Sequence, residues 1–124
     1  MVLYLVIIGK GEKVLKKKAF EKMKKGVILV NTARGPIVEE QDLVDALRDG
    51  KLRGAGLDVF DNEPNINPEL VAMENVITTP HIASATWEAR EKMGYMAVDA
   101  ILDTFSDKQP SNIVNKDVWP NRRK

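Results

Sequence analysis

The amino-acid sequence predicts an α/β fold in which helices cover a small parallel sheet. Three segments have the apolar, branched character of strands, namely residues 27–30, 52–60 and 75–81. Segments in which apolar residues recur at helical spacing lie before, between and after them. This alternation is typical of parallel strands joined by right-handed helical crossovers. Because three strands make a small sheet, we predict about half of a doubly wound fold.

The first half of the chain contains a helix, a strand and a second helix. Residues 10–26, "KGEKVLKKKAFEKMKKG", carry apolar side chains three and four positions apart, which predicts a short amphipathic helix that ends at Gly26. Residues 27–30, "VILV", predict a strand that is buried on both faces. Residues 39–51, "EEQDLVDALRDGK", have acids in the first turn and Gly50 after the last turn, which predicts the second helix.

The second half contains two strands, a short helix and a long helix. In residues 52–60, "LRGAGLDVF", glycines mark places where the backbone of the strand comes close to a neighbour. Asn67 as an N-cap and Pro68 at the first helical position predict a short helix before the third strand. After that strand, Thr86 is a suitable N-cap for a long helix over residues 87–108.

Composition and charge limit the class of function. The 19 basic and 18 acidic residues nearly cancel, so nothing favours nucleic acid, and we interpret the lysines of residues 10–25 as a solvated helix face. The chain has no cysteine, which excludes disulfides and thiolate chemistry. The apolar run over residues 2–8 is too short to cross a membrane. We therefore expect one cytoplasmic domain with no membrane or nucleic-acid partner and no metal site.

Polar side chains follow each of the three predicted strands, at the sheet edge where ligands bind in such folds. Arg34 closes the end of the first strand, Asp58 lies at the end of the second with Glu63 five residues further on, and His81 ends the third. An arginine can grip a carboxylate with two hydrogen bonds, a histidine can exchange a proton near neutral pH, and a carboxylate can orient the imidazole ring. From the residues alone, a structural histidine, a surface arginine and a solvated loop acid remain open as alternatives.

Two longer motifs indicate a protein family more specifically than the polar residues at the strand ends do. Residues 28–64, "ILVNTARGPIVEEQDLVDALRDGKLRGAGLDVFDNEP", and residues 75–86, "NVITTPHIASAT", resemble the D-isomer-specific 2-hydroxyacid dehydrogenases, the family of glyoxylate, hydroxypyruvate, phosphoglycerate and formate dehydrogenases. The resemblance covers roughly residues 15–116 and implies a partial Rossmann-like sheet, the second half of the cofactor domain, with a long C-terminal helix. Formate dehydrogenase fits less well, because we expect a glutamine in place of Glu63.

The resemblance also implies roles for single residues. Arg34 would bind the substrate carboxylate, His81 would be the catalytic acid and base, and Glu63 would pair with His81. The implied cofactor, NAD or NADP, would exchange a hydride with a small 2-hydroxy or 2-keto acid such as glyoxylate or hydroxypyruvate. Asp58 would lie near the nicotinamide carboxamide. The full set of cofactor contacts that the resemblance implies is Thr32, Ala33, Arg34, Asp58, His81, Ile82, Ala83 and Ser84.

We divide the chain into an apolar, glycine-containing leader without a match over residues 1–13, a partial cofactor domain over 14–108 and a polar tail over 109–124. In the leader, "GKGEKV" is no phosphate loop, because Val14 stands where G-x-G-x-x-G requires a third small residue, and we take the helix to begin there. We expect the phosphate loop, and the acid that selects NAD over NADP, to lie upstream.

As such a fragment, the chain would have little or no dehydrogenase activity alone. The alternative is a non-catalytic remnant that binds a nucleotide weakly, or that pairs with a full-length partner through an open sheet edge. In either case, the exposed edge would also allow a homo-oligomer to form.

Overall fold

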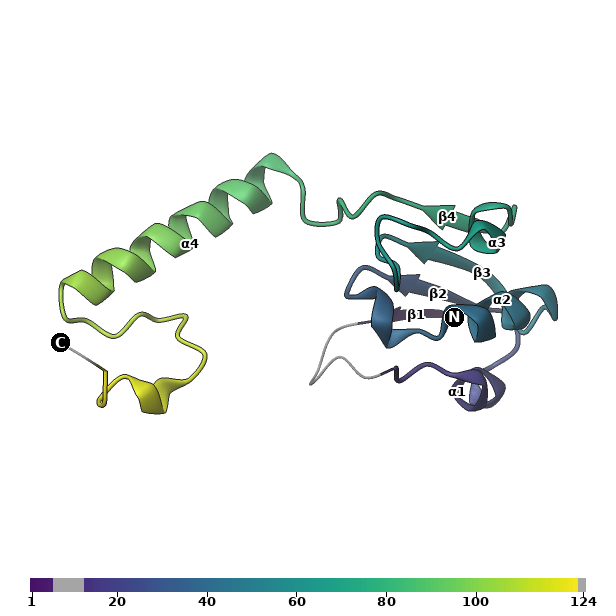
Figure 1. Ribbon diagram of the computed structural model, residues 1–124, viewed down its shortest axis with the longest axis horizontal. Helices are drawn as coiled ribbons and strands as arrows, with labels where there is room; N and C mark the ends of the chain where they lie inside the picture. Colours follow the sequence, from purple (N-terminus) through teal and green to yellow (C-terminus); the bar gives the residue numbers. More distant parts are fainter. Residues whose placement is uncertain (6–12, 123–124) are drawn as a thin grey trace. The chain divides into compact units, whose positions relative to one another are not determined.

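The computed structural model describes residues 1–5 and 13–122, which form two compact units, Met1–Ala83 and Ser84–Lys124. The boundary between these units lies between residues 83 and 84, whereas the division made from the sequence placed boundaries after residues 13 and 108. The first unit holds a four-stranded parallel sheet in the order β1-β2-β3-β4 (Figure 1). Its strands are β1 (Val2–Leu5), β2 (Val27–Asn31), β3 (Leu52–Leu57) and β4 (Val76–Thr78). The α/β class and the parallel sheet predicted from the sequence are confirmed.

Strand β1 was not among the three predicted strands, and it lies in the segment that we took for a leader. It pairs in parallel with β2, from Val2 opposite Ile28 to Leu5 opposite Asn31. A short apolar run at the start of a chain carries no periodicity of its own, so only the open edge of β2 makes it a strand. The glycine-containing stretch around Gly9 lies outside the described residues.

The helices of the first unit are α1 (Lys17–Lys22), α2 (Glu40–Arg48) and α3 (Pro68–Val71), with a short 3-10 helix, η1 (Gly35–Ile37). Helix α1 begins three residues after Val14, where we predicted its start. The cause is a tertiary contact, because Leu15 forms a parallel bridge with Val38 and its N–H donates to the Ile37 carbonyl. The end signal of α2 is confirmed, since Gly50 follows it in the left-handed region at φ 66°.

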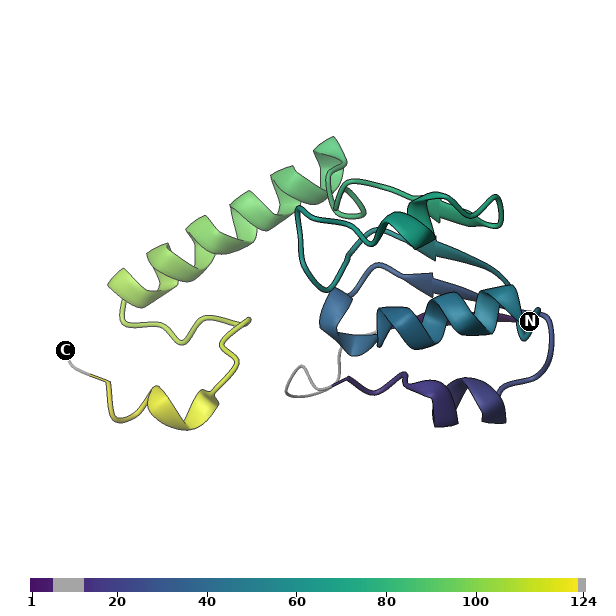
Figure 2. The ribbon, with the colours of Figure 1, turned by 45° about the vertical axis from the view of Figure 1, so that its right-hand side comes forward.

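The core lies on one face of the sheet, which α1 and α2 cover side by side (Figure 2). Phe20 of α1 and Val44 of α2 are buried against Val27 and Leu29 of β2. Ile28 and Val30, which alternate with these two residues along β2, point to the other face of the sheet and are only half-buried. The prediction of burial on both faces is therefore met on one face only within the described residues.

The second unit contains the long helix α4 (Trp87–Phe105) and the 3-10 helix η2 (Lys116–Val118). The predicted cap of α4 is confirmed, because the Thr86 hydroxyl accepts a hydrogen bond from Ala89 N at 3.1 Å. No residue of α4 is buried. Further along, the Arg122 guanidinium stacks 3.6 Å above the Trp119 ring. Within the described parts of the chain, none of the helices has both the length and the apolar character that crossing a membrane requires.

Candidate active site

The three loops that carry the candidate residues leave the sheet side by side. Strand pairing puts Asn31 opposite Leu57, and Leu57 opposite Thr78, so β2, β3 and β4 end in register. Because the strands are parallel, these three ends share the carboxyl edge of the sheet, where ligands bind in α/β folds. The loops that follow therefore start next to one another.

The loop after β2 is held by one buried side chain, that of Asn31. Its Nδ2 donates to the Arg34 carbonyl at 3.0 Å, and its Oδ1 accepts from the Ala33 N–H at 3.1 Å. These two bonds close a tight turn around residues 31–34. The Arg34 side chain stays exposed, with Nη1 donating to the Ala33 carbonyl at 2.7 Å. The turn thus presents a guanidinium at the carboxyl edge of the sheet.

Gly35 lets the loop after β2 pack directly against the loop after β3. A Cβ atom at Gly35 would lie 1.9 Å from the carbonyl carbon and oxygen of Phe60 and 2.4 Å from Asp61 N. All three are backbone atoms, so no side chain can rotate to make room. The close approach of the two loops therefore requires glycine at position 35.

Charged side chains also hold the loop after β3 in place at Asp61, next to its contact with Gly35. The Asp61 N–H donates to Oε1 of Glu40 at 2.8 Å. The Asp61 carboxylate pairs with Lys13 at 2.8 Å, and the same Lys13 amine pairs with Glu39 at 2.9 Å. Asp61 first, and then Glu39, raise the pKa of the Lys13 amine well above its usual range. This network joins the loop to α2 and to the segment before α1.

Glu63 and His81, predicted to pair, are in contact. Glu63 Oε2 lies 2.9 Å from His81 Nδ1, and Glu63 Oε1 accepts from the Phe60 N–H at 2.9 Å. The hydrogen bond from His81, followed by that from Phe60, lowers the pKa of the Glu63 carboxyl. Glu63 is therefore ionised at neutral pH. A hollow of about 170 Å³ adjoins the pair, and its lining residues are Phe60, Glu63, Pro64, Ile66, Pro80 and His81.

Asp58, five residues before Glu63 in the sequence, is only 3% exposed. Its Oδ1 accepts from the Thr79 hydroxyl at 2.5 Å and from Ile82 N at 2.8 Å, and its Oδ2 accepts from Ala83 N at 2.8 Å. Burial, the largest influence, raises the pKa of the Asp58 carboxyl. The three hydrogen bonds together outweigh burial, so this pKa lies below its ordinary value and Asp58 is a carboxylate at neutral pH.

The structure thus brings most of the predicted residues to one edge of the sheet. Glu63 contacts His81, and Asp58 contacts Ile82 and Ala83, whereas the Arg34 side chain turns back to its own loop. Thr32 and Ala33 directly follow β2, and Ser84 opens the second unit.

Sequence reasoning missed Asn31, Gly35 and Thr79 as the residues that position the site. The available signals were a polar residue ending a buried strand, a glycine after the arginine, and a hydroxyl two residues before the histidine.

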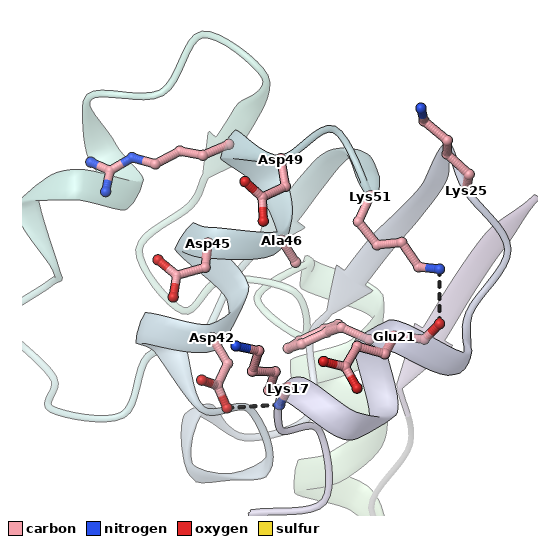
Figure 3. Close-up of a pocket in the computed structure, with 10 residues that line it drawn as sticks. Lys17, Glu21, Lys25, Asp42, Asp45, Ala46, Asp49 and Lys51 are labelled. Atoms are coloured by element: carbon pink, nitrogen blue, oxygen red, sulfur yellow. Dashed lines mark hydrogen bonds between the residues drawn. The ribbon is translucent and has the colours of Figure 1, made fainter.

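A wider hollow of about 540 Å³ lies between α1 and α2, and none of the predicted site residues lines it. Figure 3 shows its mixed lining of lysines and acids, several of which bind the protein's own groups. The Lys17 N–H donates to Asp42 at 2.7 Å, and the Lys51 amine donates to the Glu21 carbonyl at 2.9 Å. In the residues that the structure describes, no cluster of three or more side chains has the make-up of a metal site.

Comparison with known proteins agrees with this geometry. Residues 1–83 match the family described as D-isomer specific 2-hydroxyacid dehydrogenase, NAD binding domain. The chain belongs to this family, which confirms the resemblance of its motifs. The match begins at residue 1 and so includes residues 1–13, which the motifs alone left without a counterpart.

Individual relatives are similar over most of this chain. A glyoxylate/hydroxypyruvate reductase B of Enterobacter sp. is 43% identical over 113 residues, which cover 90% of this chain and 33% of that protein. The apo D-mandelate dehydrogenase of Rhodotorula graminis superposes with a TM-score of 0.83 at 32% identity, covering 93% of this chain and 34% of that one.

A third relative, an NADPH-dependent glyoxylate/hydroxypyruvate reductase of Sinorhizobium meliloti in complex with NADP and malonate, has a TM-score of 0.76 at 36% identity, covering 85% of this chain and 34% of that one. The chain spans about a third of the length of these relatives.

Proposed function

We propose that the chain carries the catalytic residues of a D-2-hydroxyacid dehydrogenase. The reaction is hydride transfer between the nicotinamide of NAD or NADP and a small 2-hydroxy or 2-keto acid, such as glyoxylate or hydroxypyruvate. The observation that carries the proposal is the contact of Glu63 with His81 at the carboxyl edge of the sheet, in a chain of this family. Arg34 is proposed to bind the substrate carboxylate.

The contact with Glu63 determines which ring nitrogen of His81 exchanges the proton with the substrate. Because Glu63 is ionised and accepts at Oε2, the Nδ1 atom of His81 carries hydrogen, and Nε2 is left for the substrate. In the reduction, the charged ring donates the Nε2 proton to the keto oxygen. In the oxidation, the neutral ring accepts the hydroxyl proton at the same atom. Proton transfer of this kind contributes about 10²- to 10⁴-fold to a rate.

Arg34 suits the carboxylate of such a substrate. Its guanidinium is exposed and close to the backbone of its own loop, which Asn31 holds in place. A planar fork of donors can bind both oxygens of a carboxylate at once, which fixes the orientation of the neighbouring keto group. Arg34 would therefore both bind the acid and orient the carbon that receives or loses the hydride.

The residues present fit the nicotinamide end of the cofactor. A carboxamide needs hydrogen-bond acceptors, and the Asp58 carboxylate uses three of about four acceptor positions within the chain. The flanking loops include the small residues Ala33, Ala83 and Ser84, beside which a flat ring would come close to the backbone. The residues proposed to contact the cofactor are Thr32, Ala33, Arg34, Asp58, His81, Ile82, Ala83 and Ser84. NAD or NADP, when bound, supplies or takes up the hydride.

A chimera tests the proposal, because the chain alone spans about a third of its relatives and we expect little or no turnover from it. In the chimera, this chain replaces the matching segment of the Enterobacter reductase. We expect keto-acid-dependent oxidation of NADH or NADPH. Arg34→Lys should lower kcat/KM for the keto acid by roughly tenfold or more, because a bidentate contact to a charged group is lost. Arg53→Lys, which changes another exposed arginine, is the matched control and should have no effect.

Two results would overturn the proposal. One is a chimera that folds and binds NADH but does not turn over glyoxylate or hydroxypyruvate, which would favour a non-catalytic remnant. The other is an active chimera in which Arg34→Lys and Arg53→Lys behave alike, which would remove Arg34 from the substrate site.

A further inference from the structure

The backbone of the loop after β4 wraps around one buried carboxylate. Asp58 accepts hydrogen bonds from the Thr79 side chain and from two consecutive backbone N–H groups, those of Ile82 and Ala83. The residue before these two N–H groups, His81, has a φ of 54°. A left-handed residue followed by N–H groups that converge on an anion is the arrangement known as a nest.

The left-handed conformation of His81 needs such support. Residues other than glycine are strained there, and they stay there only when their surroundings hold them. Among the described residues, His81 and Asp107 are the non-glycine residues with positive φ. For His81 the surroundings are identifiable, because Asp58 binds the two residues that follow it and the Thr79 side chain two positions before it.

The backbone conformation of His81 also determines where its ring can reach. The φ angle sets the direction of the bond from Cα to Cβ, so a change to the usual negative region would swing the imidazole away from its present position. Its partner is fixed independently, because Glu63 Oε1 is bound by the Phe60 N–H. The contact between Glu63 Oε2 and His81 Nδ1 at 2.9 Å therefore depends on the loop after β4.

We propose that Asp58 is a positioning residue, which holds His81 in the left-handed conformation that delivers its imidazole to Glu63. For the significance of this pair in catalysis, the inference rests on the proposed function. It goes beyond a contact of Asp58 with the cofactor, because it gives the carboxylate a task in the chain by itself. The carboxylate is ionised at neutral pH, so the nest is filled by a full negative charge.

NMR titration of the full chain tests the inference without substrate or cofactor. His81 is the only histidine in the sequence, so its ring signals are assigned without ambiguity. In Asp58→Asn, the amide protons of Ile82 and Ala83 should move upfield and the His81 ring signals should shift. The pKa of the Glu63 carboxyl should rise toward its ordinary value of about 4.3 as the His81 hydrogen bond is lost.

The sign of the Glu63 change separates positioning from simple electrostatics. The negative charge of Asp58 raises the pKa of Glu63, so removing that charge alone would lower this pKa. Loss of the His81 contact acts in the opposite direction. Asp61→Asn is the matched control. It also removes a carboxylate charge from the loop that carries Glu63, but this carboxylate pairs with Lys13 and not with the loop after β4. A Glu63 pKa that stays or falls in folded Asp58→Asn, with unchanged His81 ring signals, overturns the inference.

A second pair of variants applies if Asp58→Asn does not fold. Thr79→Val removes one of the three donors to Asp58, and Thr79→Ser keeps that donor. We expect Thr79→Val to shift the Glu63 pKa and the Ile82 amide signal in the same direction, by a smaller amount, and Thr79→Ser to restore both. Equal behaviour of the two variants overturns the inference. A supporting NMR result with an inactive chimera would retain the positioning role of Asp58 and reject the proposed reaction.

Discussion

Adding one methyl group at Gly35 is expected to damage both stability and the active-site geometry. In Gly35→Ala, the new Cβ would lie 1.9 Å from backbone atoms of Phe60, whereas non-bonded carbon atoms settle at about 3.5 Å or more. The two loops would have to separate by about 1.5 Å. The loop after β3 also carries Glu63, so this movement would pull Glu63 away from His81.

The loss in the free energy of unfolding depends on which atoms can move away from the new Cβ. Overpacking usually costs about 1–3 kcal/mol. Here both partners are backbone, and Asp61 is tied on the far side to Glu40 and Lys13. We therefore expect a loss at the upper end, about 3 kcal/mol in the free energy of unfolding. That is a large fraction of the roughly 5–15 kcal/mol that stabilises a typical domain.

Urea unfolding followed by the amide signals of β2 and β3 measures the loss in the first unit. The matched control is Gly94→Ala in α4, where a new Cβ would meet no atom within 4 Å. This control should leave β2 and β3 unchanged and favour α4 by up to about 1 kcal/mol. If Gly35→Ala unfolds within about 0.5 kcal/mol of the unmodified chain, the claimed loop contact is refuted.

Three further predictions concern pH, the loop after β2 and the long helix. The pKa values of Asp58 and Glu63 are lowered in the folded chain, so the stability that they contribute is present above the ordinary values near 4 and is lost as the pH falls through the folded values. Urea midpoints should therefore fall below about pH 4, and constant midpoints would contradict the assigned contacts. Asn31→Ala should cost about 1–3 kcal/mol in urea unfolding, because the two hydrogen bonds by which the buried Asn31 side chain holds the Arg34 loop are lost. Thr86→Ala should destabilise α4 by about 1 kcal/mol, and an unchanged circular dichroism melting curve would argue against the cap.

The helices were the most predictable part of the fold, since their signals are local. Gly50 in the left-handed region after α2 and the Thr86 cap of α4 depend only on neighbouring residues. Strand β1 was missed because its existence depends on the edge of β2, more than 20 residues away in sequence. The start of α1 shifted for the same reason, since Leu15 is drawn into a bridge with Val38.

Which candidate residues gather at the carboxyl edge of the sheet was predictable, but the geometry of their contacts was not. Arg34, Glu63 and His81 could be chosen because each follows a strand whose carboxyl end shares one edge with the others. What brings Glu63 to His81 is non-local, namely the close approach at Gly35 and the hydrogen bonds of Asp58 to residues 24 and 25 positions away. Gly35 and Thr79 stand out in the sequence only as a small residue and a hydroxyl near the candidate residues, and neither signal says which distant group it contacts.

In the proposed reaction, His81, oriented by Glu63, exchanges the proton with the substrate of a nicotinamide-dependent hydride transfer. The most direct test is the ratio of kcat for keto-acid reduction between the chimera and its His81→Asn variant, at saturating NADH or NADPH. Loss of the acid should lower kcat by about 10²- to 10⁴-fold, while binding of the reduced cofactor stays nearly the same. A folded His81→Asn variant that keeps kcat within a few-fold of the chimera would contradict the claim.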